Sequence, residues 1–313
     1  MKNDPSTSLK TGNSTAECIA ILAILIVIIL VAPKGVSIST PNSNNFSIST
    51  NPGGESATTA PDSSYARDIS LGTGNATYAY QAYEEYVTIG NRGRNPVNIT
   101  NWYLKNAKDK RAYNLGGELR YFKADTATIG QAALFVSPGG HNTFQDVVLQ
   151  RGENAIITTG SVGSQLPYKI VSFKENICSG YLENLPEYVF TPQLTTNCPR
   201  PIEEPGVDRL DTGCRKFIER MPSCHTPEFD TRDSEGEICR NCVDGKLLSS
   251  SCVLFIKNHF NYGSCLSNHG NDQNFSGRTW RIFLGRGWEM WAKEFETIEL
   301  FDQFGRLVTS RTY

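Results

Sequence analysis

The chain has 313 residues, a formal net charge of −2 and 39 % apolar residues. This length predicts one large or two modest domains. Proteins that bind nucleic acid usually carry a strongly basic surface, so the near-neutral charge argues against nucleic acid as the main ligand.

The first element in the chain is an apolar run from Cys18 to Ala32 that contains no charge and no polar amide. A helix needs about 17–25 residues to cross a bilayer, so this run would make a short span. Pro33 and Lys34 follow it, whereas a cleavable signal would end in small residues. We therefore predict a single-pass membrane anchor over residues 18–34, with residues 1–17 in the cytoplasm. A cleaved signal peptide and a buried core segment are the alternatives.

Residues 35–64 are mostly Ser, Thr, Asn, Pro and Gly, and Glu55 and Asp62 are the only charged residues among them. Such a composition buries too little apolar surface to offset the entropy lost on ordering. We predict a flexible stalk that holds the following body away from the membrane.

The body begins near Tyr65 with short strands separated by turns. Residues 85–90 alternate, which places Val87 and Ile89 on one buried face. Near the C-terminus, Ile298 and Leu300 alternate in the same way before the hairpin signature Asp302-Gln-Phe-Gly305. The other predicted strands are residues 97–99, 132–136, 147–149, 155–158, 168–173 and 306–308. Many short strands at close spacing predict an antiparallel sandwich or barrel.

A change of phase in the alternation marks a corner in the chain. Val97 and Ile99 occupy odd positions, whereas Trp102 and Leu104 occupy even ones. A strand with a period of two cannot bury both pairs without a bulge or a corner. We place it at Thr100-Asn101, because asparagine tolerates the left-handed backbone conformation. Trp102 then enters the core and packs there, rather than serving as a platform for a ligand.

The periodicity becomes helical between residues 202 and 274. One helix is predicted from about Pro205 and Asp208 to Pro222, and a second from Ser249 to Gly263. Eight of the nine cysteines lie in or near this region: Cys178, Cys198, Cys214, Cys224, Cys239, Cys242, Cys252 and Cys265. Disulfides would stabilise so small a core, and they require an oxidising compartment, so the body is predicted to lie outside the cytoplasm.

The predicted disulfides join cysteines that are near in sequence: Cys178–Cys198, Cys214–Cys224, Cys252–Cys265 and Cys239–Cys242. The alternative is a zinc site at Cys239-Arg-Asn-Cys242, whose spacing suits a metal. Its further ligands would come from the surrounding cysteines and histidines, namely Cys224, His225, His259 and Cys265. Only one clean pair is present, and zinc suits reducing compartments better, so no metal or other cofactor is predicted. A redox role for the close pair is a further alternative.

The β motifs resemble those of the lamin-tail domain. The match lies in Glu85-Tyr-Val-Thr-Ile89 and Pro96-Val-Asn-Ile-Thr-Asn-Trp-Tyr-Leu104, with weaker echoes at residues 149–156 and 298–308. Asn101 stands where that family usually has glycine. The resemblance implies an immunoglobulin-like antiparallel β-sandwich built from residues 65–201 and 275–313, interrupted by the helical insert at 202–274. It implies a module for interaction or attachment and no reaction.

Aromatic residues gather before the last strands, and Trp288 and Trp291 are candidates for a binding surface, with Trp280, Phe283 and Phe295 nearby. The alternative is that these residues close a core between insert and sandwich. His269-Gly-Asn-Asp272 suggests a nuclease-like cluster, but no acidic pair, Ser elbow or phosphate loop accompanies it. We therefore interpret it as a loop after a helix.

These observations predict a membrane-anchored, extracytoplasmic, non-catalytic binding or structural protein of the cell envelope. Its partners would be the membrane, through the anchor, and an unidentified protein or envelope polymer. One alternative is an accessory module that recruits a separate envelope hydrolase. The other is a metal-dependent enzyme that uses the Cys and His residues of the insert.

Overall fold

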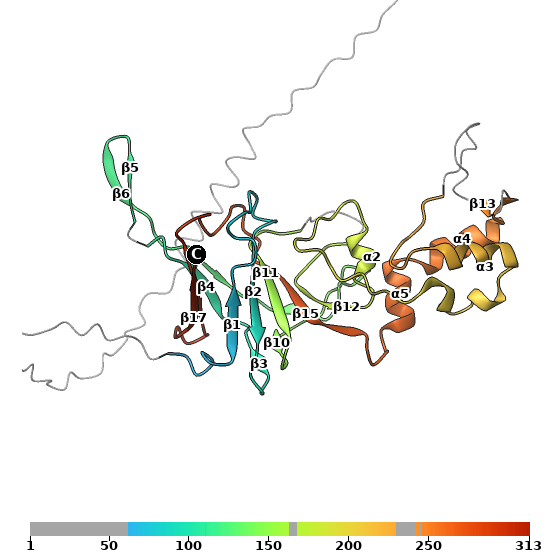
Figure 1. Cartoon of the computed structure of the whole chain (residues 1–313), viewed down its shortest axis with the longest axis horizontal. Helices are drawn as coiled ribbons and strands as arrows, with labels where there is room; N and C mark the ends of the chain where they lie inside the picture. The colour runs from blue at the N-terminus through green and yellow to red at the C-terminus, as the bar shows by residue number, and fades with distance from the viewer. Residues whose placement is uncertain (1–61, 110, 163–167, 230–241, 244–245) are drawn as a thin grey trace, which may run out of the picture. The chain divides into compact units, whose positions relative to one another are not determined.

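The computed structural model describes residues 62–109, 111–162, 168–229, 242–243 and 246–313. In this part of the chain the fold is mainly β, with a few short helices toward the C-terminal half (Figure 1). The predicted anchor at residues 18–34 and nearly all of the predicted stalk lie outside the described residues. Among the described residues, no helix is both long and apolar enough to cross a membrane.

The larger sheet has seven strands in the order β1-β2-β11-β15-β12-β8-β9. Their bounds are Ile69–Gly72 (β1), Tyr86–Asn91 (β2), Asn154–Thr158 (β11), Ser276–Phe283 (β15), Phe173–Asn176 (β12), Ala132–Ala133 (β8) and Phe144–Gln145 (β9). Strand β15 pairs parallel with β11, and β12 pairs parallel with β8. The prediction of a wholly antiparallel sandwich is therefore wrong for this sheet. Parallel neighbours need long crossover connections, and the long excursion between β11 and β15 supplies one of them.

The smaller sheet has four antiparallel strands in the order β17-β16-β4-β7. Their bounds are Leu307–Thr312 (β17), Thr297–Phe301 (β16), Tyr103–Asn106 (β4) and Thr126–Thr128 (β7). Three further two-stranded pairs stand apart from both sheets in the described residues, and one of them, between Cys242–Val243 (β13) and Lys246–Leu247 (β14), lies between β12 and β15 in the sequence. Another joins β3 (Val97–Asn98) to β10 (Val148–Leu149), and the third is a hairpin of β5 (Ala112–Leu115) and β6 (Glu118–Tyr121).

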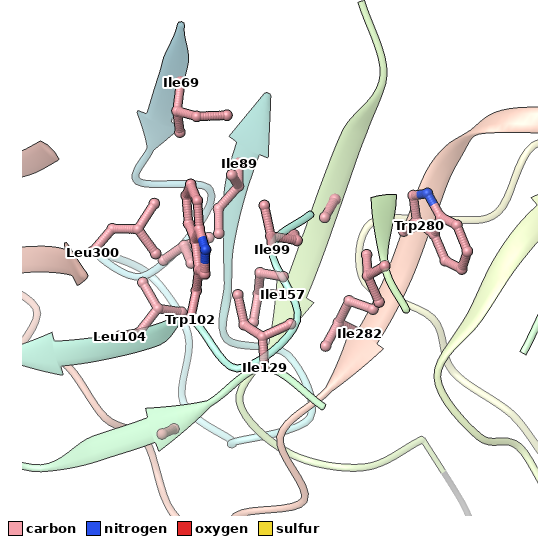
Figure 2. Close-up of a cluster of buried hydrophobic side chains, with 14 of the residues drawn as sticks. Ile69, Ile89, Ile99, Trp102, Leu104, Ile129, Ile157, Trp280, Ile282 and Leu300 are labelled. Carbon is pink, nitrogen blue, oxygen red and sulfur yellow. The ribbon is translucent and has the colours of Figure 1, made fainter. Parts of the chain in front are cut away.

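The two sheets share one hydrophobic core, and all six side chains predicted to build it are fully buried: Val87, Ile89, Trp102, Leu104, Ile298 and Leu300. Figure 2 shows Trp102 among Leu104, Leu300 and Ile129. The indole nitrogen of Trp102 donates a hydrogen bond to Oε1 of Gln303 at 2.8 Å. Each large side chain buried in this way contributes roughly 1.5–3 kcal/mol.

The predicted corner before Trp102 is confirmed. Asn101 has φ of 65°, and its backbone N–H donates to the carbonyl of Ile129 at 2.8 Å. This left-handed residue separates β3 from β4, so Ile99 and Leu104 both face the core despite their opposite parity.

A second core lies in the excursion from β12 to β15, and it includes helices, short strands and six cysteines. The elements are α2 (Gly180–Glu183), η1 (Pro201–Glu203), η2 (Val207–Arg209), α3 (Thr212–Arg220), β13 (Cys242–Val243), β14 (Lys246–Leu247), α4 (Ser250–His259) and α5 (Tyr262–His269). Helix α3 starts later than predicted, because Asp211 caps it by accepting from the N–H of Cys214 at 2.9 Å. Gly263 does not end a helix as predicted. It lies inside α5, which Asn261 caps by accepting from the N–H of Ser264 at 2.9 Å.

A buried ion pair fastens this excursion to the larger sheet. Arg281 on β15 and Glu175 on β12 have side chains that are each only 4 % exposed, and the Arg281 Nε donates to a carboxylate oxygen of Glu175. The Arg281 guanidinium also donates to the carbonyls of Pro192 and Gln193, each at 2.6 Å. Thr195 donates its hydroxyl to the other Glu175 oxygen at 2.6 Å. The pair therefore fixes residues 192–195 against strands β12 and β15 of the larger sheet.

Candidate functional site

Two loops lie side by side at one end of the sheets. One connects β1 to β2 (residues 73–85), and the other connects β15 to β16 (residues 284–296). Both contact the short turn that follows β11. The N–H of Gly160 donates to the carbonyl of Ala82 at 2.6 Å, and the N–H of Arg286 donates to the carbonyl of Thr159 at 2.9 Å.

The buried carboxylate of Glu85 joins the two loops. It accepts hydrogen bonds from the Thr159 hydroxyl at 2.6 Å, from the N–H of Met290 at 2.7 Å and from the N–H of Trp291 at 3.2 Å. Burial raises the pKa of Glu85 above its ordinary value, and the three donors oppose that rise. Both carboxylate oxygens accept hydrogen bonds from the chain and Glu85 is fully buried, so its side chain positions the two loops.

The loops expose a group of aromatic side chains, which we call the aromatic surface: Tyr78, Tyr80, Tyr83 and Trp288. Tyr80 is 73 % exposed and Trp288 is 62 % exposed. Trp291, predicted to share a binding surface with Trp288, is only 3 % exposed and packs in the core between the sheets. The prediction is wrong for Trp291, because the Glu85 contact turns its backbone inward.

Two cations lie against these rings. The Lys293 Nζ lies 3.1 Å from the ring centroid of Tyr80, and the Arg286 guanidinium lies 5.7 Å from that of Trp288. Arg286 is itself held by Asp125 at 2.7 Å. A contact between a cation and the face of an exposed aromatic ring contributes about 0.5–1 kcal/mol. The contact between Lys293 and Tyr80 also links the two loops directly.

Six of the described cysteines form three disulfides, in different pairs from the three predicted for them. The bonds join Cys178 to Cys265, Cys198 to Cys224 and Cys214 to Cys252. The predicted pairs Cys178–Cys198, Cys214–Cys224 and Cys252–Cys265 are therefore wrong. Tertiary packing brings together cysteines that are far apart in sequence, and sequence spacing carries no record of that packing.

Disulfide formation also bears on the zinc alternative. Cys242 is disulfide-bonded, and Cys239, its predicted partner, lies outside the described residues. A cysteine in a disulfide has no thiolate to offer a metal. His259, another candidate ligand, stacks on the ring of Phe255 at 4.1 Å. Within the ranges that the structure describes, no three His, Cys, Asp or Glu side chains are grouped to hold a metal ion.

The His269 cluster sits at the end of α5. The Nδ1 of His269 lies 2.8 Å from Asp272, and its Nε2 lies 3.0 Å from the buried carboxylate of Glu204. Partial burial lowers the pKa of His269, but the two carboxylates outweigh this effect and raise the pKa above its ordinary value. Both ring nitrogens are engaged, so the imidazole joins α5 to the η1 segment.

The insert also contains a cavity of about 580 Å³ between the ends of α2 and α3. Leu185, Phe217 and Met221 give it an apolar wall, and His225 and Glu228 lie at its polar side. Residues 230–241 and 244–245, which adjoin Glu228 and Cys242 in sequence, lie outside the described residues. We therefore base no function on this cavity.

The chain matches no protein-family model, no curated protein and no solved structure. The roles assigned to its residues therefore rest on the geometry of the chain itself. By that geometry, the aromatic surface combines exposed rings with a rigid support. Glu85 and the Thr159-Gly160 turn supply the support, and such pre-organised aromatic loops are typical of binding surfaces.

Proposed function

We propose that the chain is a non-catalytic binding protein of the cell envelope that acts outside the cytoplasm through its aromatic surface. The observation that carries this proposal is the exposure of Tyr78, Tyr80, Tyr83 and Trp288 on two loops that buried contacts hold together. Tyrosine and tryptophan offer large, rigid contact areas at low cost in side-chain entropy, and they are enriched at recognition surfaces. The partner is an envelope polymer or an envelope protein.

The location follows from the cysteines and the apolar run. Three described disulfides and the oxidised Cys242 fit an oxidising compartment, since the cytosol keeps most thiols reduced. The apolar run from Cys18 to Ala32 would then hold the body at the membrane as a single-pass anchor.

For the fold family we propose a lamin-tail-like, immunoglobulin-like sandwich carrying a disulfide-stapled insert. Two features support it. Tyr86–Ile89 of the matching segment lies on β2, with Val87 and Ile89 buried in the shared core, and the left-handed Asn101 directs Trp102 into that core. The parallel pairing of β11 with β15 departs from the antiparallel pattern of that family.

The absence of catalysis is also part of the proposal. The buried charges of the described residues have partners within the chain: Glu85 binds three donors, Glu175 pairs with Arg281, and Glu204 binds His269. Groups satisfied in this way stabilise the fold, whereas a catalytic group needs a face that is open to substrate.

Truncation of the aromatic surface tests the binding role. Tyr80→Ala and Trp288→Ala should each weaken co-sedimentation of the full-length protein with isolated cell-envelope fragments by about tenfold or more, as expected of central aromatic anchors. Leu254→Ala is the matched control, because Leu254 is similarly exposed but lies on α4. Equal binding by all four proteins would refute the assignment.

The same assay identifies the class of partner. Protease treatment of the fragments abolishes binding if the partner is a protein, and glycosidase treatment abolishes it if the partner is a polysaccharide. A melting temperature within about 2 °C of wild type for each variant excludes loss of folding as the cause.

A further inference from the structure

The hairpin of β5 and β6 has no neighbouring strand among the described residues. Gly116 and Gly117 form its two-residue turn with φ of 63° and 90°, and nothing lies within 4 Å of where their Cβ atoms would be. Figure 1 draws the hairpin (green) clear of the other strands. No other strand of the described residues therefore pairs with either of its outer edges.

The hairpin also exposes apolar side chains on both faces. Leu119 is 64 % exposed and Tyr121 is 60 % exposed, and Leu115 and Phe122 are exposed as well. An isolated two-stranded hairpin is at best marginally stable in water. An open edge that carries apolar side chains is a template for pairing with another strand. The hairpin thus has the features of a docking element.

The pairing register shows which backbone groups face outward. Leu115 lies opposite Glu118 beside the turn, and the N–H of Phe122 donates to the carbonyl of Arg111 at 2.9 Å. In an antiparallel pair, residues alternate between those bonded to the opposite strand and those whose N–H and C=O point away. On β6 the outward-facing residues are Leu119 and Tyr121, so an added strand would bond to their backbone.

We propose that this edge binds the same edge of a second copy of the chain. In an antiparallel pairing centred on Leu119, each Leu119 faces the partner's Leu119. Glu118 then faces the partner's Arg120, and Arg120 faces the partner's Glu118. The sequence Glu118-Leu-Arg120 is thus complementary to itself, and the pairing extends two hairpins into a four-stranded sheet with two cross-strand ion pairs.

Other registers of the same edge lack this complementarity. Sliding the pairing by two positions places Arg120 opposite the partner's Arg120, and like charges directly opposite each other are destabilising. The β5 edge, Ala112–Leu115, carries no charge that would fix a register. The charges of β6 therefore select the register centred on Leu119. Four short strands bury little surface, so the dimer is weak and depends on protein concentration.

Charge reversal tests this pairing. We compare wild type, Glu118→Arg, Arg120→Glu and the double swap by sedimentation of the full-length protein in detergent. Each single reversal turns both attractive contacts into repulsive ones and should raise the dimer dissociation constant about tenfold or more. The double swap restores opposite charges and should return the constant to within about threefold of wild type. Association through any other surface would be equal in all four proteins, and that result would overturn the proposal.

A cysteine at the two-fold axis gives a second, direct readout. Residues paired at such a site have Cα atoms about 5.5 Å apart, a distance that a disulfide spans. Leu119→Cys should therefore form a covalent dimer under mild oxidation. Leu115→Cys is the control, because three strand spacings of about 4.8 Å would separate it from its counterpart. Equal cross-linking of both variants, or of neither, would show that β6 does not pair with its copy.

Discussion

Replacement of Arg281 by methionine should be among the most destabilising single changes in the chain. The substitution keeps the length of the side chain but removes the cation from a site where only 4 % of the side chain is exposed. Glu175 would keep one side-chain donor, the Thr195 hydroxyl, and the carbonyls of Pro192 and Gln193 would lose their guanidinium donors. Breaking one side of a buried ion pair costs about 3–5 kcal/mol.

The assay is equilibrium unfolding in guanidinium chloride, with the disulfides intact, followed by tryptophan fluorescence. Arg278→Met is the matched control, because Arg278 is on the same strand but exposed, and it should change the unfolding free energy by less than about 0.5 kcal/mol. The double variant Arg281→Met with Glu175→Leu should have an unfolding free energy at least about 1 kcal/mol higher than Arg281→Met alone, since it leaves no unpaired buried charge. A loss below about 1 kcal/mol in the single variant would refute the role of the pair.

Three further outcomes are expected. Replacing Cys178 and Cys265 by serine should lower the unfolding free energy by about 3–5 kcal/mol, because their bond closes a sequence separation of 87 residues. Denaturant titration measures this loss, and an unchanged unfolding midpoint would contradict the prediction. Asn101→Gly should leave the unfolding free energy nearly unchanged, whereas Asn101→Val should lower it by about 1–2 kcal/mol, because positive φ is unfavourable for a β-branched residue. Equal melting temperatures of the two variants would contradict the left-handed conformation at Asn101. Because the folded pKa of His269 is raised, the stability that it contributes is fully present below the unfolded value and disappears as pH rises through the folded value. His269→Gln should thus be destabilising near pH 5.5 and lose that effect at high pH, and a pH-independent difference would exclude the contact with Glu204 as its cause.

The parts of the fold that were predictable from the sequence depend on local constraints. The alternation of apolar and polar residues located β2 and β16. The change of parity around Asn101 required a corner there, independently of the rest of the fold. Strand β15 was not predicted, although it lies inside the larger sheet. Its buried Arg281 looks like a solvent-facing residue until Glu175, 106 positions earlier, is placed beside it.

The candidate site was only partly predictable for a similar reason. Trp288 and Trp291 are equivalent in an irregular stretch, and only the contact of Glu85 with the backbone at Trp291 separates the exposed ring from the buried one. The tyrosines at positions 78, 80 and 83 form a visible cluster in the sequence. Their exposure depends on the loop's position beside Lys293, which no periodicity records.

The disulfide pattern has a consequence for how the chain is made. The bond between Cys198 and Cys224 interlocks in sequence with that between Cys214 and Cys252, and the bond between Cys178 and Cys265 encloses both. A chain that is exported from its N-terminus would bring neighbouring cysteines together first, and none of the three bonds between described residues joins cysteines that are neighbours in the sequence. Maturation therefore needs exchange of early bonds by thiol attack, a process that takes seconds to hours depending on the isomerase. The yield of correctly folded protein would then depend on the isomerase capacity of the compartment as much as on the sequence itself.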